Sequence, residues 1–124
     1  MILVVDDHPI NRRLLADQLG SLGYQCKTAN DGVDALNVLS KNHIDIVLSD
    51  VNMPNMDGYR TTEEIRSLPD KRAQIPIVAM TANVFDEDKK KAYEAGMNGY
   101  IAKPIDTKAI FSTLGEILQE KSEN

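Results

Sequence analysis

Carboxylates follow two of the apolar runs in this 124-residue chain, at the points where each run gives way to a loop. Asp6 and Asp7 come directly after residues 2–5, and Asp50 comes directly after residues 44–49. If the two runs are neighbouring strands, the three carboxylates converge, and two unit charges roughly 4 Å apart repel by about 4 kcal/mol at a surface-like dielectric. Such a group needs a cation or a shared proton to persist. The spacing therefore predicts an anionic, cation-binding centre.

Two further polar residues lie at the ends of later apolar runs: Thr81 follows residues 75–80, and Lys103 follows residues 99–102. Clustered carboxylate oxygens favour Mg²⁺, and so hard an ion disfavours the imidazole of the neighbouring His8. A divalent cation, an ammonium group and a hydroxyl around a carboxylate suit phosphoryl transfer, with the carboxylate as nucleophile and an acyl phosphate as product. The spacing leaves open which aspartate attacks.

Short apolar runs alternate with segments of helical periodicity, as expected for strand–helix units that build a parallel sheet. We predict five strands, at residues 2–5, 24–29, 44–49, 75–80 and 99–102. Five helices follow them: from Pro9 to before Gly23, after a cap at Asp31, from near Gly58 to before Pro69, from about Phe85 to Ala95, and after a cap at Asp106. The predicted fold is a doubly wound α/β sheet, whose ligands bind beyond the carboxyl ends of the strands.

Composition narrows the function classes. Hydrophobic residues make up 42% of the chain and charged residues 27%, which predicts one globular domain over residues 1–124. The net charge of −5 argues against contact with nucleic acid or an anionic membrane. No run approaches the roughly 20 apolar residues of a membrane span. The single Cys26 excludes an internal disulfide, so a reducing, cytoplasmic location is expected.

Four motifs resemble the signature of response-regulator receiver domains, in order and with matching spacing over essentially the whole chain. They are Val4-Val5-Asp6-Asp7, the Asp-Val-Asn-Met-Pro-Asn-Met-Asp-Gly sequence of residues 50–58, Met80-Thr81-Ala82 and Lys103-Pro104. The resemblance implies a flavodoxin-like fold with strand order 2-1-3-4-5. Residues 6–12 are similar to receivers of hybrid histidine kinases in phosphorelays. Up to about Tyr59 the chain resembles one such receiver, and beyond it others, which suggests a chimeric chain.

The resemblance implies that Asp50 accepts phosphate from a phosphohistidine. Asp7, Asp50 and the backbone carbonyl of Asn52 would bind Mg²⁺ directly, and Asp6 would act through water. Lys103 would contact Asp50 and later the phosphoryl oxygens. In this family the domain catalyses only its own phosphorylation and dephosphorylation and turns over no separate substrate, whereas a parent hybrid chain is a histidine kinase.

The resemblance also implies a switch. The hydroxyl of Thr81 and the amide of Ala82 would bind the phosphoryl group, and Tyr100 would swing inward as Thr81 moves. Tyr100 equally fits a half-buried tyrosine of a strand. Asn52 and Asn83 match positions that tune hydrolysis of the acyl phosphate.

A histidine kinase or histidine-phosphotransfer domain is the implied partner, docking near the first helix and Pro104. The first helix has more apolar residues than one buried face needs, among them Ile10, Leu14 and Leu15, and this excess favours the docking site. The fourth helix, fifth strand and fifth helix would form the output face and a weak homodimer contact.

Three alternatives stay open. A phosphatase of the haloacid-dehalogenase type needs Asp-x-Asp after its first strand, but His8 occupies the third position here. A flavin-binding flavodoxin needs a Ser/Thr/Gly phosphate loop, where this chain has Asp6-Asp7-His8-Pro9. A receiver that is never phosphorylated is disfavoured because every acceptor-site residue is present.

Overall fold

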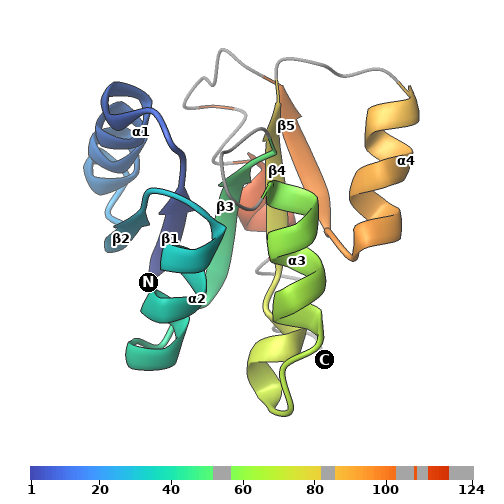
Figure 1. Ribbon diagram of the computed structural model, residues 1–124. Coiled ribbons are helices and arrows are strands. Elements are labelled where there is room, and N and C mark those ends of the chain that lie inside the picture. The colour runs from blue at the N-terminus through green and yellow to red at the C-terminus, as the bar shows by residue number, and fades with distance from the viewer. Residues whose placement is uncertain (52–56, 82–85, 103–107, 109–111, 118–124) are drawn as a thin grey trace.

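The computed structural model of the chain describes residues 1–51, 57–81, 86–102, 108 and 112–117. A parallel sheet lies at its centre, and its order is β2-β1-β3-β4-β5 (Figure 1). The strands are β1 (Ile2–Val5), β2 (Cys26–Ala29), β3 (Ile46–Asp50), β4 (Ile77–Thr81) and β5 (Gly99–Ala102). The predicted doubly wound fold and its strand order are confirmed.

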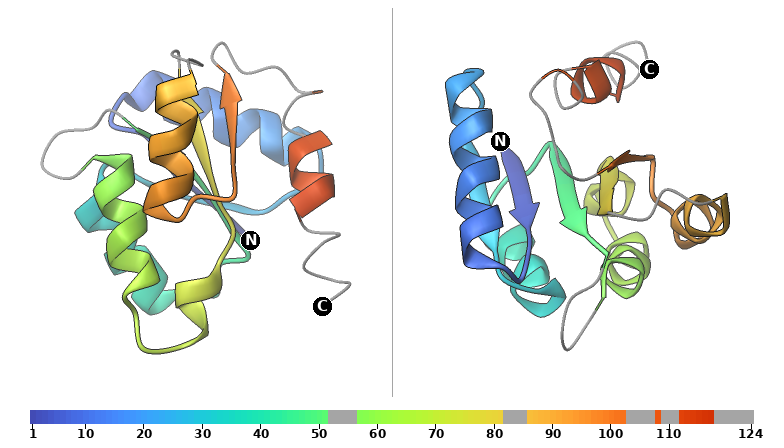
Figure 2. Two further views of the ribbon diagram at one scale, coloured as in Figure 1. Left: turned by 90° about the vertical axis from the view of Figure 1, so that its right-hand side faces the viewer. Right: turned by 90° about the horizontal axis from the view of Figure 1, so that it is seen from above.

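Helices cover both faces of the sheet (Figure 2). Helix α1 (Pro9–Ser21) and the helical residues 112–117 lie on one face, while α2 (Gly32–Lys41), α3 (Gly58–Arg66) and α4 (Asp86–Ala95) lie on the other. These are the five helical segments that the sequence predicts, and the cap predicted at Asp106 falls outside the described residues. In the described ranges, no helix is both long and apolar enough to cross a bilayer.

Each strand contributes to two hydrophobic cores because successive side chains point to opposite faces. Leu3 and Val5 of β1 belong to the core beneath α2, α3 and α4, together with Leu39 and Ile65. Their neighbours Ile2 and Val4 belong to the opposite core, which includes Leu15 and Leu19 of α1 and Leu114. Burial on both faces explains why β1 is apolar throughout and why β4 is apolar up to Thr81.

Strands β2, β3 and β4 each begin two residues later than the sequence predicts, and the delays of β2 and β4 have a local cause. The backbone N–H of Tyr24 donates to the carbonyl of Leu19, so Tyr24 closes the end of α1 and does not join β2. Pro76 has no N–H to donate to a ladder, and β4 begins directly after it. Strand β3 starts at Ile46, which pairs with the first residue of β1.

Side-chain caps position the helices around the carboxyl edge of the sheet. The side chain of Asp31 accepts a hydrogen bond of 2.8 Å from the N–H of Asp34, which confirms the cap predicted for α2. Asp57 caps α3 in the same way, accepting from the N–H of Arg60 at 2.8 Å. A 3₁₀ helix η1 (Lys71–Gln74) precedes β4 and was not predicted, because a single short turn carries no hydrophobic periodicity.

Candidate functional site

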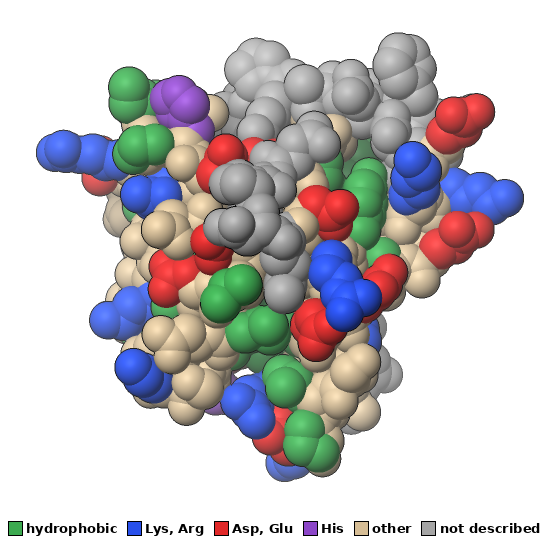
Figure 3. All heavy atoms as spheres, viewed as in Figure 1, with side chains coloured by type: hydrophobic (Ala, Val, Ile, Leu, Met, Phe, Trp, Pro, Cys, Tyr) green, Lys and Arg blue, Asp and Glu red, His purple; other side chains and the backbone are tan. Residues whose placement is uncertain are grey.

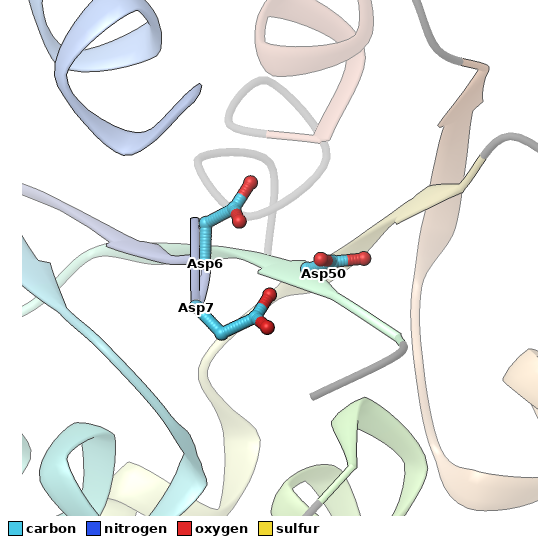
Figure 4. A group of neighbouring side chains, drawn as sticks. All are labelled: Asp6, Asp7 and Asp50. Carbon is cyan, nitrogen blue, oxygen red and sulfur yellow. The ribbon is translucent and has the colours of Figure 1, made fainter. Parts of the chain in front are cut away.

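The side chains of Asp6, Asp7 and Asp50 converge at the carboxyl edge of the sheet (Figure 4). One oxygen from each carboxylate lies within 4.8 Å of the others. Strands β1 and β3 are adjacent and parallel, with Val5 paired to Ser49, so the residues that follow them meet at the same edge. The convergence predicted from the sequence is therefore confirmed.

The three carboxylates differ in exposure. Asp6 and Asp50 are buried, at 2% and 7% exposed, whereas Asp7 is exposed to solvent. The backbone N–H of His8 donates to Oδ1 of Asp6 at 2.9 Å, and this turn orients the Asp6 carboxylate. The His8 side chain itself is exposed. An oxygen-rich group with one solvent-facing member suits a hard divalent ion that keeps part of its water shell.

Thr81 and Tyr100 lie together beside this group. Asp50 pairs with Met80 across β3 and β4, which places Thr81 at the same edge of the sheet, where it is buried. Thr81 and Tyr100 both line a small cavity of about 10 Å³ between the sheet and α4. Its other lining residues are Val51, Tyr59, Ala79, Lys89 and Ala92. The two side chains of the predicted switch thus line the same cavity.

The remaining predicted site residues fall outside the described part of the chain. They are Asn52, Ala82, Asn83, Lys103 and Pro104. Their proposed roles still rest on the motifs alone.

Arg12 supports the site in a way that the residue types did not indicate. Its guanidinium donates to the backbone carbonyl of Asp6 at 2.9 Å and so ties α1 to the end of β1. The only sequence signal for this role is that Arg12 lies in the stretch 6–12. An arginine on a helix is normally interpreted as a solvated surface charge.

Cys26 lies away from these carboxylates, in β2, and is half-buried. Burial raises the pKa of its thiol, so the reactive thiolate is disfavoured at neutral pH.

The response regulator receiver domain model matches residues 2–115 of the chain. The chain is 68% identical over 114 residues to the sensor histidine kinase RcsC of Escherichia coli K12, an alignment that covers 92% of this chain and 12% of that protein. The chain thus spans about an eighth of the length of this curated relative. At 114 residues the similarity extends well beyond Tyr59.

Solved structures agree with the sequence comparison. The chemotaxis protein CheY4 of Vibrio cholerae superposes with a TM-score of 0.87 at 31% identity, covering 93% of this chain and 95% of that chain. The receiver domain of the sensor histidine kinase PA1611 from Pseudomonas aeruginosa PAO1 superposes with a TM-score of 0.80 at 37% identity, covering 96% and 93%. That structure has a magnesium ion coordinated in its active-site cleft.

These matches favour the receiver over the phosphatase and flavin-binding alternatives. The family match spans the sheet, the three converging carboxylates and Thr81, and the sheet order is the one that the receiver resemblance implies. This chain belongs to the response regulator receiver domain family.

Proposed function

We propose that this domain takes a phosphoryl group from a phosphohistidine onto Asp50 and changes conformation through Thr81 and Tyr100. The observation that carries the proposal is the convergence of Asp6, Asp7 and Asp50 at the carboxyl edge of the sheet. A hybrid histidine kinase is the kind of parent chain in which the domain would act, in the cytoplasm.

Among the three carboxylates, Asp50 is the best placed to be the acceptor. It lies on β3, between β1 with its two aspartates and β4 with Thr81. Asp6 is oriented by the N–H of His8, and Asp7 faces solvent. Asp50 therefore lies on the strand between the other two aspartates and Thr81, and this position supports its role as nucleophile.

A divalent cation fits the remaining carboxylates. Asp7 and Asp50 would hold Mg²⁺ with the backbone carbonyl of Asn52, and Asp6 would act through water, as the motifs imply. Bound Mg²⁺ neutralises the carboxylates and stabilises charge on the transferring phosphoryl group. The magnesium ion in the PA1611 receiver supports this cofactor.

The chemical step needs no other cofactor. A carboxylate oxygen of Asp50 attacks phosphorus, the P–N bond to the donor histidine breaks, and its electron pair stays on the imidazole. The product is an acyl phosphate, with Lys103 and the amide of Ala82 as the proposed phosphoryl contacts. Attack by water then returns the carboxylate and inorganic phosphate, at a rate that Asn52 and Asn83 would tune.

Phosphorylation changes the charge at position 50 from −1 to about −1.5 to −2 and adds acceptor oxygens. The hydroxyl of Thr81 would turn toward these oxygens, and Tyr100 would follow into the space beside it. The effect is a shift between two pre-existing conformations. The output face would consist of α4, β5 and the last helix, and would also be the site of a weak homodimer.

The phosphoryl donor would dock on α1. Ile10 and Leu14 of α1 are 64% and 57% exposed, which is unusual for large apolar side chains. Exposed hydrophobic side chains are visible over this end of α1 in Figure 3. Their position beside the loop that carries Asp6 and Asp7 supports docking of a histidine kinase or histidine-phosphotransfer domain there.

The test is labelling of Asp50 by a small phosphoryl donor, such as acetyl phosphate, in the presence of Mg²⁺. Asp50→Asn removes the nucleophile and is expected to abolish labelling. Asp17→Asn is the matched control because Asp17 lies exposed on α1, and it is expected to be labelled like the unmodified domain. Undiminished labelling of Asp50→Asn would contradict the assignment, and absence of labelling in the unmodified domain would indicate a receiver that is not phosphorylated.

A further inference from the structure

Two side chains of α4 contact the ring of Tyr100. The ammonium Nζ of Lys89 lies over the ring, 4.8 Å from its centroid. The ring of Tyr93 meets it edge-on, with the centroids 6.5 Å apart and the planes at 81°. Lys89 and Tyr93 are four residues apart, so they lie on the same side of α4 and act on Tyr100 together.

We propose that Lys89 and Tyr93 are positioning residues that set the orientation of the Tyr100 ring and, through it, the ease of switching. The inference rests on the switch role proposed above for Tyr100. Nothing in the motifs of the acceptor site involves these two residues.

Both contacts depend on the direction in which the ring points. A cation is attracted to the face of an aromatic ring, and a second ring prefers an edge-to-face contact with it. Tyr100 therefore loses both contacts if its ring rotates away from α4. Each contact favours the observed orientation, by about two- to fivefold for a cation near the surface and about two- to tenfold for an aromatic pair.

The cavity beside Thr81 links these contacts to the movement of Tyr100. Lys89, Tyr100 and Thr81 all line it, and at about 10 Å³ it holds no more than one water molecule. A tyrosine ring does not fit into so small a space, so Tyr100 moves toward Thr81 only if a lining side chain moves too. Lys89 contacts both the ring and the cavity, and so couples the position of α4 to that of the switch.

The arrangement also explains the sequence of α4. The helix is strongly polar, but its Lys89 side chain is only partly exposed to solvent. The helix also carries a large aromatic residue, Tyr93, whose side chain is 52% exposed. A lysine bends its apolar stem along neighbouring apolar surface and keeps its charge in water, which allows it to cover a half-buried ring. Lys90, one position along, is exposed and pairs with Glu94 at 3.9 Å.

The experiment measures the rotamer populations of Tyr100 by NMR in the full chain, from three-bond couplings and ring-carbon relaxation dispersion. The test variants are Lys89→Gln, Tyr93→Leu and the double variant. Lys89→Arg keeps a cation over the ring, and Lys90→Gln makes the same charge change on the exposed side of α4. A thermal melt of each variant verifies that the fold is intact.

We expect Lys89→Gln to change the Tyr100 population ratio by about two- to fivefold, and the double variant by about four- to fiftyfold. Lys89→Arg and Lys90→Gln should leave the ratio as it is in the unmodified chain. The inference would be overturned if the Tyr100 rotamer ratio were the same in Lys90→Gln as in the double variant.

A second measurement separates this inference from the proposed function. If Tyr100 is the switch, the affinity for beryllofluoride with Mg²⁺ changes in the double variant together with the rotamer ratio, because the apparent affinity scales with the population of the binding-competent conformation. A changed rotamer ratio with unchanged affinity would retain the role of Lys89 and Tyr93 in orienting the ring and refute their effect on switching together with the switch role of Tyr100. Failure of the unmodified chain to bind beryllofluoride would refute the acceptor site, and the rotamer ratios would still decide the inference.

Discussion

Gly58, the first residue of α3, lies directly against the backbone of Asp50. A Cβ at position 58 would collide with the carbonyl oxygen of Asp50 and come within 2.8 Å of the Cα of Val51. Both are backbone atoms at the end of β3, so neither can move without displacing the strand. The N–H of Gly58 also donates to the carbonyl of Val51 at 2.9 Å. Position 58 therefore sets where the proposed acceptor carboxylate lies.

Gly58→Ala should lower the free energy of unfolding by about 1–3 kcal/mol, the usual cost of overpacking. It should also slow phosphorylation of Asp50, because the methyl group pushes the end of β3 away from Asp6 and Asp7. Urea denaturation and labelling by acetyl phosphate measure the two effects. Gly20→Ala in α1 is the control, since nothing lies within 4 Å of its Cβ position. It should stabilise the domain by up to about 1 kcal/mol and leave labelling unchanged.

Replacing a carboxylate of the anionic group should stabilise the metal-free domain and weaken its binding of Mg²⁺. Asp6→Asn removes one of three negative charges but keeps the oxygen that accepts the hydrogen bond from the N–H of His8. Relief of repulsion is expected to add about 1 kcal/mol to the free energy of unfolding in EDTA.

Thermal melts with EDTA and with Mg²⁺ check this expectation, because a ligand that binds only the folded state raises the melting temperature. The rise on adding Mg²⁺ should be smaller in Asp6→Asn than in the unmodified domain. Asp17→Asn, an exposed change on α1, should alter neither value appreciably. A variant that is less stable in EDTA and equally stabilised by Mg²⁺ would contradict the proposed metal site.

Ile10→Glu should slow phosphoryl transfer from a histidine-phosphotransfer partner by about tenfold or more, because it places a charge at the centre of the proposed docking surface. Labelling by acetyl phosphate and the free energy of unfolding should stay the same, since the Ile10 side chain is 64% exposed. Val33→Glu on α2, at 55% exposed, makes the same change outside that surface. Equal transfer rates for the two variants would place the docking surface elsewhere.

Arg66→Met should destabilise the domain by about 2–3 kcal/mol, because it leaves partly buried carbonyl groups without their donor. The guanidinium donates to the carbonyls of Gly96, Ala73 and Ile75 and to Oδ1 of Asn98, at 2.7–2.9 Å. Burial lowers the pKa of Arg66, although an arginine stays charged at neutral pH.

Chemical denaturation measures this effect, with Arg60→Met in the same helix as control. Arg60 pairs only with Glu64 among the contacts described for its side chain, at 2.8 Å on the surface, and its loss should cost no more than about 0.5 kcal/mol. Similar costs for Arg60→Met and Arg66→Met would show that the Arg66 hydrogen bonds do not stabilise the turn between α4 and β5.

The alternation of strands and helices and the strand-end positions of the three aspartates were predictable from local patterns, whereas the strand order came from the resemblance to receiver domains. Parallel strands place their carboxyl ends at one edge, so residues directly after apolar runs share that edge however far apart they are in the sequence. Tyr24 and Pro76 show where such patterns lose accuracy, because the start of β2 depends on one backbone hydrogen bond and the start of β4 on the N–H that proline lacks.

The sequence by itself determined the fold, its two-sided core and the residue types of the site, because periodicity and strand-end position are properties of the chain. Only the tertiary structure decided that Asp6 is buried while Asp7 is exposed, that Gly58 lies against Asp50, and that Lys89 covers Tyr100. These relationships join segments whose separation in the sequence carries no periodic signal. Burial and contact depend on the packing of whole helices against the sheet, which no local pattern encodes.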